Sequence, residues 1–127
     1  MEQRAPGAPH FQDEIEQLKT RLLAMGGLAE EQVRLAVKGL VERNSGLIQR
    51  VLGGDQPLNA LHIEVDNRCF TLLALYQPMA VDLRAIVAAV KINTDLERVG
   101  DLTINIAEDV IFIVSARDVR HHPGDPT

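Results

Sequence analysis

Acidic and amide side chains recur at every fourth residue in the C-terminal half of the sequence. They are Asn93, Glu97, Asp101, Asn105 and Asp109. Residues four apart lie one above another on a helix, so this spacing predicts a ribbon of oxygen-bearing side chains. Neighbouring like charges repel by about 0.2–0.5 kcal/mol per pair, and a hard cation, which prefers oxygen ligands, would remove that cost. The ribbon therefore indicates either a cation site or a solvated charged face.

The helix that carries this ribbon must also pack into a core. Its core-facing candidates alternate at three- and four-residue steps: Ile92, Leu96, Val99, Thr103, Ile106, Val110 and Ile113. This spacing predicts that the ribbon runs beside a packed seam. If the ribbon is only a solvated face, we expect Arg98 to pair with Asp95 and Asp101, each three residues away.

The composition restricts both the fold and the partners. The 127 residues suit a single domain, and the hydrophobic content of 46% is enough for a core. Aromatic residues make up only 3% and tryptophan is absent, which favours helices packed through aliphatic side chains. The formal charge of −5 argues against binding to nucleic acid or to anionic lipid, because both require a basic surface.

Cysteine usage and hydropathy bear on the compartment. The single cysteine, Cys69, excludes an internal disulfide and is better explained as a small buried side chain than as a nucleophile. The first ten residues have no apolar signal segment. The longest stretch without a charged residue, 69–81, is too short to span a bilayer. We therefore expect a cytoplasmic protein without direct membrane insertion.

The spacing of apolar residues predicts three helices, over 11–52, 56–75 and 79–115. Gly26 and Gly27 interrupt the first pattern, but the apolar phase is the same on both sides, so we expect one continuous helix. Gly53 and Gly54 end it. Pro78 ends the second helix, because the residue before a proline avoids the α conformation.

No stretch alternates with a period of two, so the fold class is all-α. Short turns between the helices predict an antiparallel up-down-up three-helix bundle. We expect the domain to cover 11–116, with a disordered N-terminus over 1–10 and a flexible tail over 117–127. Three slender helices leave apolar surface uncovered, which favours a homodimer.

Three fragments of the sequence resemble the PhoU family of phosphate-uptake regulators. They are LLAMGGLAEEQV (22–33), ALYQPMAVDLRAIVAAVKI (74–92) and DLERVGDLTINIAED (95–109). Members of that family typically carry two three-helix repeats, and this chain has room for one. Residues 108–122 resemble the usual end of a second repeat. The resemblance therefore indicates a single-repeat or internally shortened member.

The resemblance implies a non-enzymatic regulator of phosphate homeostasis. Such a protein negatively regulates phosphate uptake and the phosphate-starvation response. It acts through contacts with a phosphate ABC transporter and a sensor histidine kinase. A homodimer of this chain would restore the pseudo-two-fold body of the longer family members.

Some members of the family bind iron or zinc clusters through E/D-x-x-x-D motifs on helix surfaces. In this sequence that motif maps onto Glu97 and Asp101, and Asn105 and Asp66 are further candidate ligands. Gly100 between the two carboxylates leaves room for an ion or for a close partner helix, and helix–helix packing explains it equally well. The second predicted helix has no clean E/D-x-x-x-D pair, so a cluster there would need ligands from two subunits.

The candidate partner-binding residues are Gln77, Asp82, Arg84 and Arg98. Pro78 and Asp82 also have simple structural explanations, as a turn residue and as an acid in the first turn of a helix. Gln77 and Arg84 are therefore the stronger candidates for contact with another protein.

Other classes of function receive less support. A di-iron bundle enzyme or ferritin-like store requires E-x-x-H motifs, and the sequence contains none. A helix-turn-helix DNA-binding protein requires a short basic recognition helix, which is also absent. The remaining alternatives are a metal-binding helical bundle and a dimeric scaffold without a role in phosphate regulation.

Overall fold

The computed structural model describes the backbone of residues 8–120 and the side chains of residues 10–115. The described elements are α1 (Ala8–Glu42), α2 (Ser45–Gly53), α3 (Asp55–Tyr76) and α4 (Ala80–Arg120). All of them are helices, so the predicted all-α bundle is confirmed over this range. The predictions for 1–7 and 121–127 lie outside the described residues, while positions 8–10 and 117–120 are helical.

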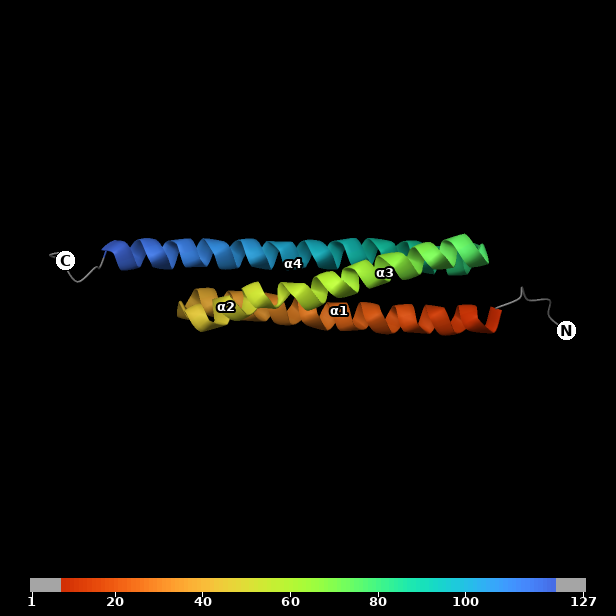
Figure 1. The fold of residues 1–127 in the computed structure, drawn as a ribbon, viewed down its shortest axis with the longest axis horizontal. Helices are drawn as coiled ribbons and strands as arrows, with labels where there is room; N and C mark the ends of the chain where they lie inside the picture. The colour runs from red at the N-terminus through yellow and green to blue at the C-terminus, as the bar shows by residue number, and fades with distance from the viewer. Residues whose placement is uncertain (1–7, 121–127) are drawn as a thin grey trace.

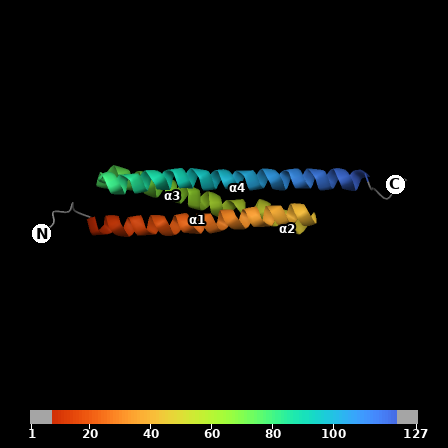
Figure 2. The ribbon, with the colours of Figure 1, turned by 180° about the vertical axis from the view of Figure 1, so that it is seen from behind.

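Three long helices lie side by side along the molecule. Figure 1 shows α3 running back beside α1, and α4 then running in the same direction as α1. The rings of Phe11 and Tyr76, with centroids 5.1 Å apart, join the start of α1 to the end of α3. Seen from behind in Figure 2, α1 and α4 lie in front of α3. Among the described helices, α3 therefore covers only one face of the α1–α4 pair.

The prediction of one continuous helix over 11–52 was wrong, because the chain breaks after Glu42. Arg43 has a left-handed φ of 52°, which interrupts the helical path. Asn44 then caps α2, its side chain accepting a hydrogen bond from the Leu47 N–H at 3.2 Å. Gly26 and Gly27 remain inside α1, as predicted.

The apolar phase continues across this break because α2 folds back onto the core that α1 serves. A Cβ placed on Gly39 would collide with the side chain of Ile48, so the absence of a side chain allows α2 to return closely along α1. A pattern of apolar spacing alone therefore cannot distinguish the two arrangements.

The core consists of two clusters arranged along the bundle. The first joins α1, α3 and α4 and contains Phe11, Ile15, Leu18, Met25, Leu58, Val65, Cys69, Leu72, Ile86 and Ala89. The second joins α1, α2 and α4 and contains Leu35, Ala36, Ile48, Val51, Ala107 and Val110. Since α3 has 22 residues and α4 has 41, α2 covers the part of α4 that α3 does not reach.

The packed side of α4 differs from the predicted seam. Ile92, Ile106 and Ile113 are 47%, 37% and 51% exposed, although the pattern placed them in the core. Asn93, which was assigned to the ribbon, is fully buried, and Gly100 is buried as well. Burial has moved by one residue along the sequence, which corresponds to a rotation of the helix by about 100°.

The rotation follows from side-chain size, because small residues let two helices approach each other. A Cβ on Gly100 would collide with the side chain of Leu58 on α3. Of the two explanations for Gly100, the structure shows helix–helix packing. Thr103 and Val110 are buried as predicted.

We predict that Gly100→Leu lowers the free energy of unfolding by about 1–3 kcal/mol, because the added side chain overpacks the contact with Leu58. The matched control is Gly27→Leu, since a Cβ on Gly27 meets nothing within 4 Å. That control should raise stability by up to about 1 kcal/mol through helix propensity. Urea unfolding followed by circular dichroism measures both. Equal stability of Gly100→Leu and the wild type would contradict the packing argument.

Candidate functional site

Four polar side chains meet where the start of α3 packs against the middle of α4. Within the described residues, each has a buried polar atom without a hydrogen-bond partner: Asp55 Oδ1, His62 Nδ1, Asn93 Oδ1 and Glu97 Oε1. We call these four residues the polar cluster. Buried polar atoms are normally hydrogen-bonded, so four such atoms in one place mark a site with unmet binding capacity.

The other polar atoms of this cluster are engaged in local hydrogen bonds. Asn93 Nδ2 donates to the backbone carbonyl of His62 at 3.0 Å, which ties α4 to α3. Asn59 Nδ2 donates to Asp55 Oδ2 at 2.9 Å, one turn along α3. The side chains are therefore held in place while one atom of each remains available.

Burial raises the pKa of the Glu97 carboxyl above its ordinary value, and the negative charges of Asp101 and Asp55 raise it further. The nearby His62 acts in the opposite direction and lowers this pKa. Glu97 is thus a carboxylate whose charge the surrounding protein does not fully compensate. A cation or a donor from another molecule would stabilise it.

Glycines and one buried amide position the two helices around this cluster. Gly100 lets α4 approach α3 next to Leu58, one turn from Glu97. At the start of α3, a Cβ on Gly54 would collide with Gln32, whose Nε2 donates to the carbonyl of Val51 at 2.8 Å. The buried Gln32 therefore holds the turn that begins α3 against α1.

The predicted metal ligands lie in different surroundings. Glu97 is half-buried in the polar cluster, whereas Asp101 and Asn105 are exposed on α4. Asp66 is exposed on α3, where it lines a surface hollow with Phe70 and Val90. Within the part of the chain whose side chains are described, no three His, Cys, Asp or Glu residues gather closely enough to hold a metal ion. The metal site stays a prediction that needs ligands from outside this bundle.

Cys69, assigned from the sequence to the core, is 1% exposed. Burial raises the pKa of its thiol to about 11, and the charge of Asp66 contributes. A thiol with this pKa is almost fully protonated at neutral pH, so it is a poor nucleophile.

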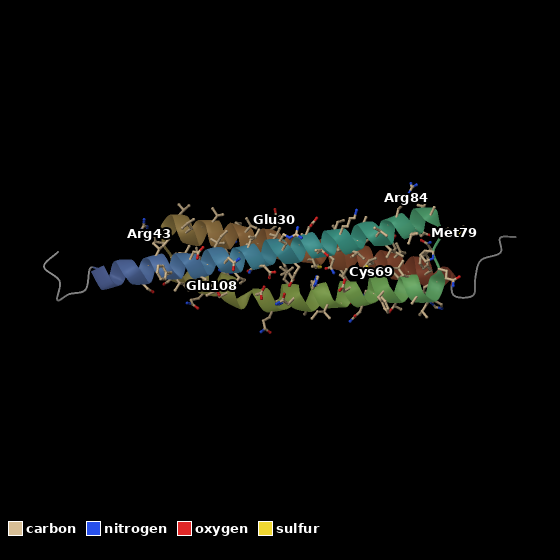
Figure 3. All side chains as sticks on the ribbon, turned by 90° about the horizontal axis from the view of Figure 1, so that it is seen from above. Glu30, Arg43, Cys69, Met79, Arg84 and Glu108 are labelled. Atoms are coloured by element: carbon tan, nitrogen blue, oxygen red, sulfur yellow. The ribbon has the colours of Figure 1, made fainter. Side chains whose placement is uncertain are left out.

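The predicted partner-binding residues lie mostly on the surface. Gln77 is exposed and has a left-handed φ of 46° at the end of α3. Asp82 is half-buried in the first turn of α4, and Arg84 extends into solvent close by (Figure 3). Arg98 is exposed and donates to Asp95 Oδ1 at 3.3 Å, which confirms the predicted pairing of these two side chains.

A network of ion pairs joins α1 to α3 on another side of the bundle. Glu64 Oε2 accepts from Arg21 at 2.7 Å and from Arg68 at 2.9 Å, and Arg68 also bonds to Glu14 at 3.0 Å. The hydrogen bond from Arg21, followed by that from Arg68, lowers the pKa of Glu64. The sequence predicted only the pair between Glu64 and Arg68.

Sequence reasoning did not find the α3 half of the polar cluster. Asp55 and His62 are seven residues apart and therefore lie on one side of α3. That spacing is a usable signal, but the partners on α4 follow only from the rotation that buries Asn93.

Comparison with known proteins identifies the family. Residues 22–110, which include most of α1, all of α2 and α3 and three-quarters of α4, match the family described as PhoU domain. The chain belongs to the PhoU family. No helix within residues 8–120 combines the length and the hydrophobicity that crossing a bilayer requires.

Several curated relatives of this PhoU-family chain are named as phosphate-specific transport system accessory protein PhoU homologues. One from Caulobacter vibrioides is 41% identical over 106 residues, which is 84% of this chain and 46% of the relative. One from Pseudomonas putida is 45% identical over 101 residues, or 80% of this chain and 40% of the relative. One from Aquifex aeolicus is 39% identical over 100 residues. The chain spans less than half the length of the relatives it matches.

We predict that Glu97→Gln stabilises the protein at neutral pH. The folded state raises the pKa of Glu97, so the wild type loses stability as the pH rises from about 4.5, the ordinary value, through the raised pKa. A neutral glutamine avoids that loss. The stability advantage of Glu97→Gln should therefore be larger at pH 7 than at pH 4, measured by urea unfolding in the presence of a chelator.

Glu64→Gln provides a matched variant with the opposite sign. The folded state lowers the pKa of Glu64, so its ion pairs stabilise the protein above the ordinary value and this contribution disappears as the pH falls through the lowered pKa. Glu64→Gln should be destabilised at pH 7 and should approach the wild type at low pH. The same sign for both variants would contradict the electrostatic assignment.

Proposed function

We propose that this chain is a non-enzymatic regulator of phosphate transport that acts in the cytoplasm as a homodimer. It lowers phosphate uptake and represses the phosphate-starvation response when phosphate is plentiful. The observation that carries this proposal is the PhoU-domain match over residues 22–110, supported by relatives that are named as accessory proteins of a phosphate transport system.

The turn between α3 and α4 is the surface through which we propose contact with the transporter or with a sensor histidine kinase. Met79 and Val81 are 79% and 77% exposed there, beside the exposed Gln77 and Arg84. Exposed apolar side chains next to an arginine supply the kind of anchor that protein interfaces use. Because this turn lies at one end of the bundle (Figure 1), a partner can reach it without disturbing the core.

We predict that Arg84→Glu relieves repression without unfolding the protein. The test uses host cells in which the chain's own gene is replaced by each variant, with a reporter driven by a phosphate-starvation promoter in high phosphate. The wild type should keep the reporter off, and Arg84→Glu should raise it several-fold. The matched control is Lys38→Glu, an equal charge change at an exposed residue near the other end of α1, which should behave as the wild type.

Two results would count against the proposal. A deletion that leaves the reporter silent in high phosphate would refute the regulatory function itself. A full response to phosphate in the Arg84→Glu variant would leave regulation intact but remove the α3–α4 turn as the contact surface.

We also propose iron or zinc binding at the polar cluster as a second function. The support is the set of unpartnered atoms in this cluster and the fully buried amide of Asn93 within it. Glu97 and Asp101 would provide carboxylate ligands, and Asn105 and Asp66 or a second subunit would complete the set. Oxygen and imidazole donors of this kind suit either metal.

We predict that the variant carrying Glu97→Ala and Asp101→Ala loses bound metal and keeps its helix content. Elemental analysis of the purified protein and of the variant measures iron and zinc, and circular dichroism measures the helices. The wild type should contain metal in proportion to protein. Equal, trace metal in both proteins would exclude the site.

A further inference from the structure

The face of the α1–α4 pair that α3 leaves uncovered carries two apolar stripes with the same period (Figure 2). The α4 stripe recurs at seven-residue steps and consists of Ala85, Ile92, Val99, Ile106 and Ile113. The α1 stripe recurs at the same step and consists of Gly26, Val33 and Leu40. A seven-residue repeat keeps its members on one side of a helix, which is the pattern of helices that pack along their length.

Both stripes border one groove between the two helices. Leu18 and Leu22 of α1 and Ala88 and Ile92 of α4 line this groove, and its surface is almost entirely apolar. Ile92 belongs to the α4 stripe, and Gly26 lies one turn beyond Leu22 on the same side of α1. The seven-residue steps then continue both stripes along this face.

The side chains of both stripes are open to solvent in the single chain. Val33 and Leu40 are 40% and 46% exposed, similar to the isoleucines of the α4 stripe. Isolated exposed apolar residues are common, but a continuous stripe on each of two adjacent helices is typical of an interface.

Gly26 adds an independent observation. A Cβ on Gly39, Gly54 or Gly100 would collide with a neighbouring side chain, so close packing within the bundle explains these three glycines. A Cβ on Gly26 would meet nothing within 4 Å. Glycine weakens a helix interior, and nothing within the described bundle requires it at this position. Another helix that approaches the α1 stripe closely would require it.

The area of this face suits a stable dimer. The α4 stripe extends over 28 residues, or about 40 Å at the helical rise, and two adjacent helices present a width of about 20 Å. The resulting footprint of about 800 Å² matches what one partner of a standard protein–protein interface contributes.

The distribution of charge along α4 favours a second copy in antiparallel orientation. The part of α4 before the middle of the stripe carries the bases Arg84 and Lys91, and residues 101–115 carry three acids and no base. A two-fold axis perpendicular to α4 near Val99 brings residue 91 of one copy beside residue 109 of the other. Parallel pairing would instead place like charges together.

We propose that a second copy of this chain covers the α1–α4 face, with the two α4 stripes antiparallel and Lys91 of each copy opposite Asp109 of the other. The arrangement is isologous, because the same surface serves both copies. The inference rests on the homodimer in the proposed function and deepens it by naming the interface. It leaves the polar cluster and the α3–α4 turn uncovered.

The first test measures mass in solution by analytical ultracentrifugation of the chain over a range of micromolar concentrations. The wild type should have about twice the chain mass of 14.0 kDa. The double variant Ile92→Glu and Ile106→Glu should weaken dimerisation by about 100-fold, because it places charges in the centre of the interface. The matched control is Phe70→Glu on α3, at a side chain that is 73% exposed on another face, and it should remain dimeric.

The second test exchanges charges. Lys91→Glu alone and Asp109→Lys alone should each weaken the dimer by about tenfold, since two-fold symmetry repeats each repulsion. The two changes together should restore the wild-type affinity. Glu108→Lys is the matched control, because Figure 3 shows Glu108 on the α3 side of α4, away from the proposed interface, and this change should have no effect.

A monomeric wild type at all concentrations would overturn the inference. So would a dimer that tolerates the Ile92 and Ile106 double variant, or charge exchanges without mutual rescue. Circular dichroism of each variant confirms that it is folded. The reporter assay measures regulation without reference to mass, so failure of this interface and failure of the proposed function can be told apart.

Discussion

The close approach of α3 and α4 at Gly100 is the constraint on which the rest of the structure depends. Because Gly100 has no side chain, Leu58 occupies its place and is fully buried. This contact determines which side of α4 faces the core. It turns Asn93 and Ala107 inward together with Gly100 and turns the isoleucines at 92, 106 and 113 outward.

Both surfaces of interest follow from that rotation. On the α3 side of α4, it buries Asn93 and half-buries Glu97 beside Asp55 and His62, where desolvation raises the pKa of Glu97. On the opposite side, it exposes a row of aliphatic side chains that cannot be satisfied by water. A single packing decision therefore produces a polar site inside the bundle and an apolar face outside it. The two lie on different sides of the same helix, so occupying one does not block the other.

Stability and function are separable in this arrangement. The ion pairs of Glu64 with Arg21 and Arg68 hold α1 to α3 and lie away from both surfaces. The exposed end at the α3–α4 turn carries Arg84 and Met79 without a structural task that the contacts reveal. Regulators that act by contact need such surfaces, because a partner must bind without unfolding the bundle.

The sequence alone determined the all-α class, the ends of α3, the continuity of α1 through Gly26 and Gly27, and the pairing of Arg98 with Asp95. These features depend on local propensity, turn residues and neighbours on one helix, all of which are readable from spacing. Only the tertiary structure decided that the chain turns at Arg43, that Asn93 rather than Ile92 enters the core, and that Asp55 and His62 meet Glu97. Each of these depends on how closely two helices approach, and that distance is set by the side chains of both partners, which no single helical pattern contains.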